Sequence, residues 1–179
     1  MKQFMLAGVS SGVGKTTVTL GILKALADRG YRVQPYKVGP DYIDTAYHSR
    51  ITKRPSRNVD SFMIPDDQSL AWSYYKWHGD ADVAVVEGVM GLFDGLGTDK
   101  DCASSASVAK KLGIPVVLII DGKATSTSAA AMVHGFATFD PDLDIAGVII
   151  NRVASQNHYE LIKGAIERYT DVEVLGYLP

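Results

Sequence analysis

The stretch from Gly8 to Thr17, GVSSGVGKTT, constrains the fold more than any other part of the chain. Its glycines and small residues leave successive backbone N–H groups free to surround an anion, Lys15 adds a positive charge for the outer phosphates, and Thr16 offers a hydroxyl to Mg²⁺. An apolar run precedes the stretch and a helix-forming run follows it. The pattern predicts a phosphate-binding loop between a strand and a helix. The residues expected to hold the nucleotide are Gly12, Val13, Gly14, Lys15, Thr16 and Thr17.

The loop is one residue longer than the common pattern G-x-x-x-x-G-K-[ST], because its first glycine is Gly8 and valine occupies position 9. In this it resembles the branch of P-loop proteins that contains the partition and nitrogenase-iron-protein ATPases and the ATP-dependent carboxylate-activating synthetases. The ATPases carry a second lysine where this chain has Ser10. Its absence favours a synthetase. The structural alternative is a glycine-rich turn that merely joins a strand to a helix.

Composition narrows the class of protein further. A chain of 179 residues with 46% hydrophobic and 21% charged residues is expected to form one compact domain. The net charge of −2 gives no broad basic field, so neither nucleic acid nor a membrane surface is an expected partner. The single Cys102 excludes an internal disulfide, and the sequence has neither a signal peptide nor a membrane-spanning run. These features predict a cytoplasmic protein.

Apolar runs and helical periods alternate along the chain. Strands are expected at 3–7, 31–37, 83–86, 115–120, 145–150 and 172–177, and helices at 15–29, about 44–51, 66–77, 103–112, 126–139 and 157–169. The segment 52–65 has no clear period and is expected to be an ordered loop. Because the strands read as apolar on both faces, we predict an α/β fold of the P-loop NTPase type. It has a three-layer architecture, in which a parallel sheet of about six strands carries helices on both faces.

Ligands of an open parallel sheet bind beyond the carboxyl ends of its strands. Glu87 follows four apolar residues there, and a carboxylate in such a place needs a cation or hydrogen-bond donors. Together with Thr16 and Asp41 it is predicted to supply oxygen ligands to Mg²⁺. Each carboxylate also has a structural explanation: Glu87 as a helix cap or surface residue, and Asp41 as the cap of the helix that follows it.

Four further residues at this edge are candidates for the chemistry. Lys37 could steady a transferred phosphoryl group, although a surface lysine would have the same pattern. Asp44 and Asp94 could orient an amine or accept its proton, or lie in solvent as ordinary loop carboxylates. Asn151 could read a nucleobase or simply form a turn. The four histidines have no metal-ligand spacing and are expected to be structural or exposed.

Three blocks of sequence resemble the cobyrinic acid a,c-diamide synthase family. They are the P-loop that starts at Gly8, the pair KVGPDYID at 37–44 and RPSRNVD at 54–60, and VEGVMGLFDG at 86–95. The resemblance implies ATP-dependent, glutamine-fed amidation of the a and c acetate carboxylates of cobyrinic or hydrogenobyrinic acid. ATP would phosphorylate a carboxylate, and ammonia would then displace phosphate. It further implies catalytic roles for Asp44 and Asp94 beside Lys15 and Lys37, and places Asn151 near the base, as in the related dethiobiotin synthetase.

One departure from the family bears on domain organisation. Whole members carry a glutaminase domain, which needs a cysteine nucleophile on a sharp strand-to-helix turn. Cys102 lacks the flanking glycines of such a turn. We therefore expect residues 1–179 to be the synthetase domain alone, a glutamine amidotransferase partner to supply ammonia, and a homodimer to be possible. The alternatives are nickel-sirohydrochlorin a,c-diamide synthase, a dethiobiotin synthetase-like ligase and, from a different class, a partition-type ATPase that switches by dimerising.

Overall fold

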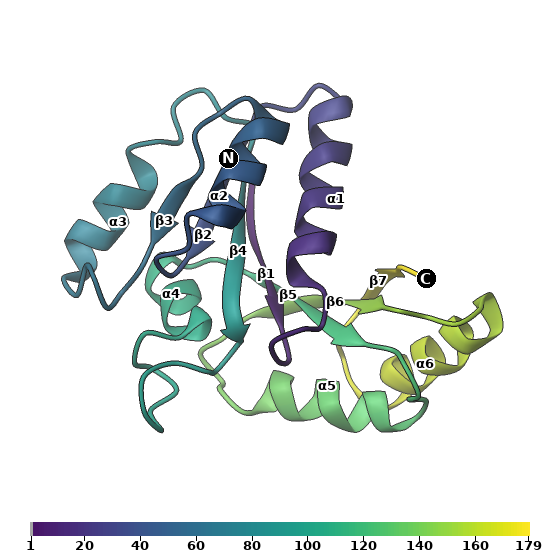
Figure 1. Cartoon of the computed structure of the whole chain (residues 1–179). Coiled ribbons are helices and arrows are strands. Elements are labelled where there is room, and N and C mark those ends of the chain that lie inside the picture. The colour runs from purple at the N-terminus through teal and green to yellow at the C-terminus, as the bar shows by residue number, and fades with distance from the viewer. Residues whose placement is uncertain (1) are drawn as a thin grey trace.

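The computed structural model describes residues 2–179, which form one seven-stranded sheet whose neighbouring strands are all parallel. The strand order is β3-β2-β4-β1-β5-β6-β7 (Figure 1). The strands are β1 (Lys2–Gly8), β2 (Val33–Val38), β3 (Arg57–Val59), β4 (Val83–Gly91), β5 (Val116–Asp121), β6 (Ile145–Asn151) and β7 (Val174–Tyr177). The α/β class and the parallel sheet are confirmed.

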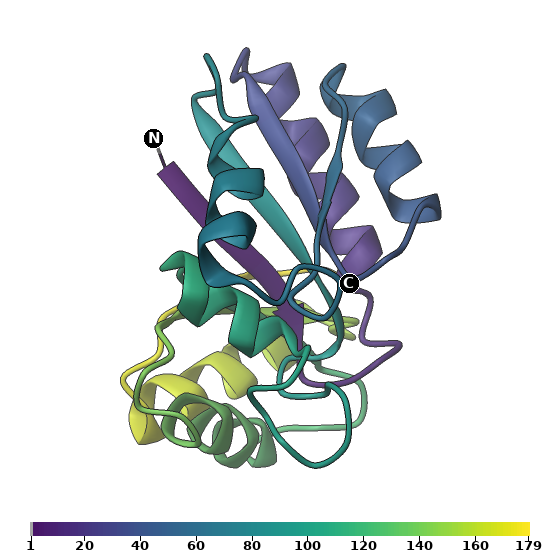
Figure 2. The same cartoon turned by 90° about the vertical axis from the view of Figure 1, so that its left-hand side faces the viewer.

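Six helices connect the strands within residues 2–179. They are α1 (Lys15–Asp28), α2 (Ile43–Thr52), α3 (Asp67–Tyr75), α4 (Ser105–Leu112), α5 (Ser128–Thr138) and α6 (Gln156–Tyr169). Figure 2 shows α1 and α2 side by side, and both pack on one face of the sheet. The other four helices pack on the opposite face, so the molecule has three layers. No helix of this described part is both long and apolar enough to cross a membrane.

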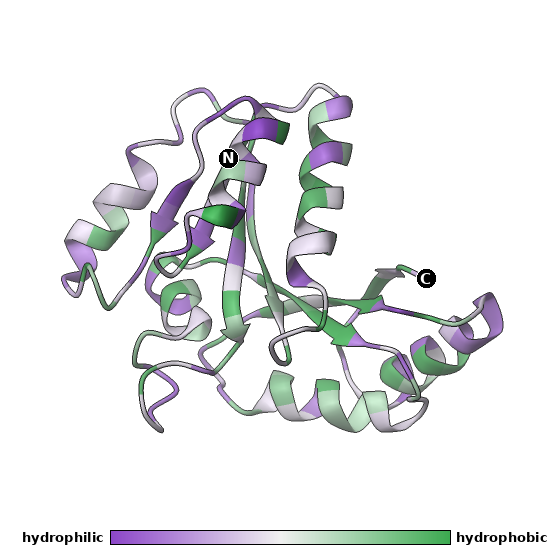
Figure 3. Ribbon diagram, in the orientation of Figure 1, coloured by the Kyte–Doolittle hydropathy of each residue, from purple (hydrophilic) through white to green (hydrophobic). Residues whose placement is uncertain are grey.

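The central strands are apolar on both faces because each face has its own core. In β1, Leu6 packs with Val18 and Leu23 of α1, whereas its neighbours Met5 and Ala7 belong to the larger core on the other side. Successive side chains of a strand point to opposite faces, so a strand covered on both sides must be apolar at every position. Figure 3 shows this as central strands that are largely green.

The prediction of a loop at 52–65 is wrong at one point, because this segment contains the edge strand β3. Three residues pair there with β2, Arg57 opposite Tyr36 and Val59 opposite Val38, and this raises the strand number from about six to seven. Only Val59 of the three is fully buried, and Figure 3 shows the strand as mostly hydrophilic. A short polar edge strand leaves no periodic signal in the sequence.

Strand β4 continues beyond its predicted end at Glu87 to Gly91. Glu87 therefore lies inside the strand, opposite Leu6 of β1 and Lys37 of β2. The glycine that follows it has a packing role, since a Cβ on Gly88 would lie 2.9 Å from the Ser105 hydroxyl oxygen on α4. Glycine in this segment thus allows α4 to pack closely on the strand, in addition to its role in the loop.

Candidate functional site

The loop Gly8–Gly14 connects β1 to α1 and leaves the amino end of that helix open. Gly14 directly precedes α1 and has a φ of 95°. No side chain caps this amino end of the helix, and the first turn contains no acidic residue. By contrast Asp66, Ser104 and Ser155 cap α3, α4 and α6 by accepting a backbone N–H. The first N–H groups of a helix have no partner within the helix, and together with its dipole they favour an anion. Thr17 is exposed at this end.

The last residue of β6 and the residue that follows it hold the loop in shape. The Asn151 side-chain nitrogen donates to the Val13 carbonyl at 2.8 Å, and Arg152 donates to the Gly12 carbonyl at 2.7 Å. Asn151 is thus next to the predicted nucleotide loop. One of its two amide N–H groups is engaged by that loop, which leaves the other N–H and the oxygen for a nucleobase. Sequence reasoning missed Arg152, although it directly follows Asn151.

Glu87 is the centre of the site. Its side chain is 1% exposed, one carboxylate oxygen lies 2.7 Å from the Thr16 hydroxyl, and the other lies 2.7 Å from Nε2 of His48. The Thr16 hydroxyl is also 3.5 Å from a carboxylate oxygen of Asp44. A buried carboxylate is costly unless donors satisfy it, and here both oxygens have partners. Thr16 and Glu87 are brought together as predicted.

Lys37 is buried at this site and is not a surface lysine. Its side chain is 4% exposed, and its ammonium group donates to the Gly88 carbonyl at 3.0 Å and to the Val38 carbonyl at 3.2 Å. It also lies 3.9 Å from a carboxylate oxygen of Asp44. The pairing of β2 with β4, which sets Lys37 opposite Glu87, is what brings this positive charge to the carboxylates.

Lys15 shares the same electrostatic environment. Its ammonium group donates to the Ser10 carbonyl at 3.1 Å. Burial lowers the pKa of Lys15, the positive charge of Lys37 lowers it further, and the carboxylates of Glu87, Asp94 and Asp44 oppose the shift. Residues from five separate parts of the chain therefore act on one another at this edge of the sheet.

Asp41 and Asp44 have different environments although they are three residues apart. Asp41 accepts the backbone N–H of Ile43 at 2.8 Å and of Asp44 at 3.0 Å, which caps α2. Burial would raise the pKa of Asp41, but these N–H groups and Lys37 outweigh it and the pKa falls below its usual value. Burial raises the pKa of Asp44, as do the charges of Glu87 and Asp41. Of the two, Asp44 is the one whose carboxylate contacts the Thr16 hydroxyl, and Asp41 is the one bound to the start of α2.

Asp94 lies in the turn after β4 and is exposed. Its carboxylate accepts the backbone N–H of Gly91 at 2.8 Å, which fixes the direction of the side chain at the end of the strand. The turn thus holds Asp94 in place while leaving it open to solvent.

The donors around Thr16 fit magnesium in kind, though not as a complete cage. Thr16, Glu87 and Asp44 offer hydroxyl and carboxylate oxygens, which Mg²⁺ prefers, with phosphate oxygens and water as the usual remaining ligands. Across residues 2–179, no three His, Cys, Asp or Glu side chains are grouped as a metal site by themselves. No hydrogen bond joins Asp41 to Thr16 or Glu87 in this described part.

From the sequence His48 is expected to be structural or exposed; it is buried, and its partners are what the sequence did not predict. It is fully buried, and besides its bond to Glu87 its Nδ1 lies 3.3 Å from the Ser56 hydroxyl. A signal was present, because His48 follows Asp44 by four residues and such positions share one face of a helix. The spacing was overlooked because it is not a metal-ligand pattern.

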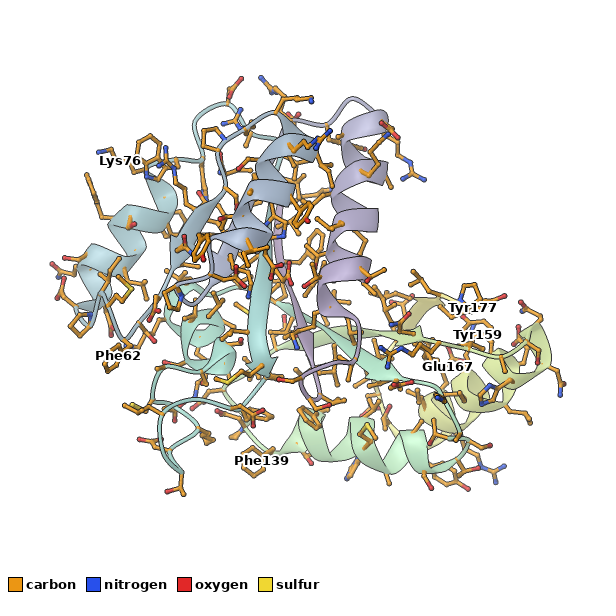
Figure 4. The ribbon with its side chains drawn as sticks, in the orientation of Figure 1. Phe62, Lys76, Phe139, Tyr159, Glu167 and Tyr177 are labelled. Atoms are coloured by element: carbon orange, nitrogen blue, oxygen red, sulfur yellow. The ribbon has the colours of Figure 1, made fainter. Side chains whose placement is uncertain are left out.

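An apolar cavity of about 400 Å³ opens beside this site. Phe62 and Met63 line it and are each 65% exposed, and Figure 4 shows Phe62 on the segment that follows β3. Pro40, Met90 and Leu96 complete its apolar wall. Pro40, Met90 and Leu96 follow or precede Asp41, Glu87 and Asp94 by one to three residues, whereas these carboxylates do not themselves line the cavity.

A parallel three-layer sheet with a glycine-rich loop before α1 and a buried carboxylate bonded to the loop threonine defines a nucleotide-binding domain of the P-loop class. The chain belongs to the family described as CobQ/CobB/MinD/ParA nucleotide binding domain (CbiA), whose profile matches residues 4–179.

Curated relatives in this family are similar along the whole chain. This chain is 98% identical over its full length to a "Cobyrinate a,c-diamide synthase" of Streptococcus sanguinis (strain SK36). It is 66% identical to a protein of that name from Listeria innocua serovar 6a. With the Salmonella typhimurium protein of that name the identity is 57% over 98% of this chain. The chain covers 40%, 40% and 38% of these relatives, so it spans about two fifths of their length.

Solved structures give the fold alone. The FtsY structure from Mycoplasma mycoides matches with a TM-score of 0.62 and 21% identity over 97% of this chain and 58% of that one. Chloroplast FtsY from Physcomitrella patens matches with a TM-score of 0.61 and 16% identity, over 97% and 57%.

Proposed function

We propose that this chain is the synthetase domain of a cobyrinate a,c-diamide synthase, a carbon–nitrogen ligase of cobalamin biosynthesis. It would use ATP and Mg²⁺ to amidate the a and c acetate carboxylates of cobyrinic or hydrogenobyrinic acid. The observation that carries the proposal is the buried Glu87 carboxylate bonded to the Thr16 hydroxyl at the mouth of the phosphate loop. The names of the relatives supply the substrate class.

The nucleotide would lie with its phosphates on the loop and on the open end of α1. Thr16 and Glu87, with Asp41 as a further oxygen donor, would hold Mg²⁺. When bound, this ion supplies positive charge to the outer phosphate oxygens. Lys15 and the buried Lys37 would offset the charge on the transferred group, because positive groups held in place before the reaction stabilise the transition state most.

The first step is phosphoryl transfer. An oxygen of the acceptor carboxylate forms a bond to the γ-phosphorus, the bond from that phosphorus to the β–γ bridging oxygen breaks, and ADP leaves. The acceptor then carries a mixed carboxylic–phosphoric anhydride, whose acyl carbon is open to attack by an amine.

The second step forms the amide. The nitrogen of ammonia forms a bond to the acyl carbon, the bond from that carbon to the phosphate oxygen breaks, and inorganic phosphate leaves. The nitrogen gives up a proton, which Asp44 would accept. The exposed Asp94 would orient the incoming ammonia or the acceptor.

The large acceptor would lie in the apolar cavity beside the site. Its wall of Phe62, Met63 and Met90 suits the hydrophobic faces of a tetrapyrrole ring, while the acetate arms reach the polar residues. The ring is much larger than the cavity, so only part of it would be enclosed and the rest would lie on the exposed rim.

Ammonia would come from a glutaminase domain outside these residues. Two observations support this: the chain spans about two fifths of its relatives, and Cys102 lies in a turn before α4 and not at a strand-to-helix nucleophile turn. A cytoplasmic location belongs to the same proposal, because the nucleotide and the tetrapyrrole are intracellular. A homodimer is proposed from the family resemblance alone.

The decisive experiment supplies the purified chain with ATP, Mg²⁺, cobyrinic acid and either ammonium or glutamine. We expect amide formation and ADP release with ammonium only. Glu87→Gln should reduce the rate at least about a hundredfold while the protein stays folded, because the ion loses a charged ligand. Preferred amidation of nickel-sirohydrochlorin would change the substrate, glutamine-dependent turnover would contradict the division of domains, and failure to bind Mg-ATP would overturn the proposal.

A further inference from the structure

Among the buried titratable side chains that the proposed mechanism does not use, His48 is the one that touches the central carboxylate. His48 is 0% exposed and Glu87 is 1% exposed, and Nε2 of the imidazole lies 2.7 Å from one Glu87 oxygen. The other Glu87 oxygen bonds to Thr16 on the phosphate loop. One oxygen of this carboxylate therefore bonds to a buried side chain, and the other bonds to the phosphate loop.

The imidazole is itself held at its other nitrogen. Nδ1 lies 3.3 Å from the Ser56 hydroxyl, and the backbone N–H of Ser56 donates to the Ser49 hydroxyl at 2.8 Å. The Ser49 hydroxyl donates in turn to the Thr45 carbonyl at 2.7 Å. Because a carboxylate only accepts, its contact assigns a proton to Nε2. A connected set of hydrogen bonds thus runs from α2 to Glu87.

This arrangement restricts the torsion angles of Glu87. A glutamate side chain has three of them, and a carboxylate bonded through a single oxygen can still rotate about its last bond. The bond from a rigid, buried ring fixes the second oxygen and so directs the first towards Thr16. Outer partners that orient a metal-binding carboxylate commonly change metal affinity about 10–100-fold when removed.

We propose that His48 is a positioning residue for Glu87, so that the ion accompanying the nucleotide meets an oxygen already set in direction beside Thr16. This inference rests on the proposed Mg-ATP function and adds to it a residue that makes no contact with the nucleotide or the acceptor. His48 does not transfer a proton in this role, and its protonation state need not change.

The test uses two amide side chains that differ only in reach. In His48→Gln, the side-chain nitrogen can take the place of Nε2 and keep the bond to Glu87. In His48→Asn, the shorter side chain reaches only the position of Nδ1, on the Ser56 side. His134 is exposed on α5, so His134→Asn serves as a control for the substitution itself.

Binding of the non-hydrolysable β,γ-imido analogue of ATP is measured by titration calorimetry, in excess Mg²⁺ and in EDTA, with thermal unfolding as the check on folding. We expect His48→Asn to weaken binding in Mg²⁺ about 10–100-fold and binding in EDTA less than about threefold. His48→Gln and His134→Asn should stay close to the parent chain. Ser56→Ala, which loosens the ring from its other side, should give a smaller loss of the same kind and stands in if His48→Asn does not fold.

The outcomes separate this inference from the function on which it rests. If His48→Asn and His48→Gln bind equally, or if the loss is as large in EDTA as in Mg²⁺, His48 has only a packing role and the inference is overturned. If the parent chain binds the analogue no better in Mg²⁺ than in EDTA, the proposed function fails first and the positioning role with it.

Discussion

Gly14 and Asn151 show how closely single residues limit one another at this site. Gly14 has a φ of 95°, and a Cβ added there would lie 2.2 Å from the Asn151 side-chain nitrogen. That nitrogen is the one that holds the Val13 carbonyl of the loop. A side chain at position 14 would therefore strain the backbone and displace the residue that keeps the loop in shape.

Gly14→Ala should accordingly lower the free energy of unfolding by about 1–2 kcal/mol through the left-handed backbone alone, and nucleotide binding should be lost. Urea unfolding and calorimetric titration with Mg-ATP measure the two effects. Gly164→Ala on α6 is the matched control, because no atom lies within 4 Å of the added Cβ. It should raise stability by about 0.5–1 kcal/mol. Normal nucleotide binding by Gly14→Ala would show that the loop is not the site.

At the scale of elements, the start of α2 combines two functions in a short segment. Asp41 caps the helix through two backbone N–H groups, and this helix carries Asp44 and His48 towards Glu87. The sequence left open whether Asp41 is a cap or a metal ligand. The observed bonds establish the cap, and the ligand role remains a prediction.

Two substitutions of Asp41 separate these roles. Asparagine caps a helix about as well as aspartate but carries no charge, so Asp41→Asn should keep the parent stability, whereas Asp41→Ala should lose about 1 kcal/mol. Thermal unfolding measures the cap, and the Mg²⁺ dependence of ATP binding measures the ligand. An Asp41→Asn chain with parental Mg²⁺ affinity would remove Asp41 from the metal site.

At the scale of the whole molecule, the buried carboxylate of Asp140 ties the loop after β4 to α4 and to the end of α5. Asp140, after α5, is 1% exposed and lies 2.6 Å from the ammonium groups of both Lys100 and Lys110. Lys100 belongs to the loop between β4 and α4, which also contains Asp94, and Lys110 to the last turn of α4. Burial alone would raise the pKa of Asp140. The hydrogen bonds from the two lysines outweigh this effect and lower the pKa to about 2.

Because the folded pKa lies below the usual 3.8, the charged carboxylate stabilises the fold above about pH 4, and this contribution is lost as the pH falls towards 2. Asp140→Asn should therefore cost about 2 kcal/mol at pH 7. Its deficit relative to the parent should shrink between about pH 4 and pH 2. Urea unfolding of both chains across this range is the measurement, with the exposed Asp144→Asn as a neutral control. A deficit that does not change with pH would mean that packing, and not charge, is what Asp140 supplies.

Much of the site could be predicted from the sequence because its parts are local. The loop needs consecutive residues, and Lys37, Glu87 and Asn151 each lie at or near the carboxyl end of an apolar run, where parallel strands bring their ends to one edge. The partners of these residues could not be predicted in the same way. The bond between Glu87 and His48 joins side chains 39 residues apart, and the bond from Asn151 reaches a backbone carbonyl 138 residues away in the chain.

The sequence by itself determined the class of fold and the nucleotide loop, since hydrophobic period and glycine spacing act over a few residues and do not depend on the rest of the chain. Only the tertiary structure decided which residues meet there. It extended β4 past Glu87, added β3 at the edge, and set Lys37 opposite Glu87. The physical reason is that strand register and helix packing are fixed by burial over the whole core, and a buried charge takes its partner from whatever that packing brings within reach.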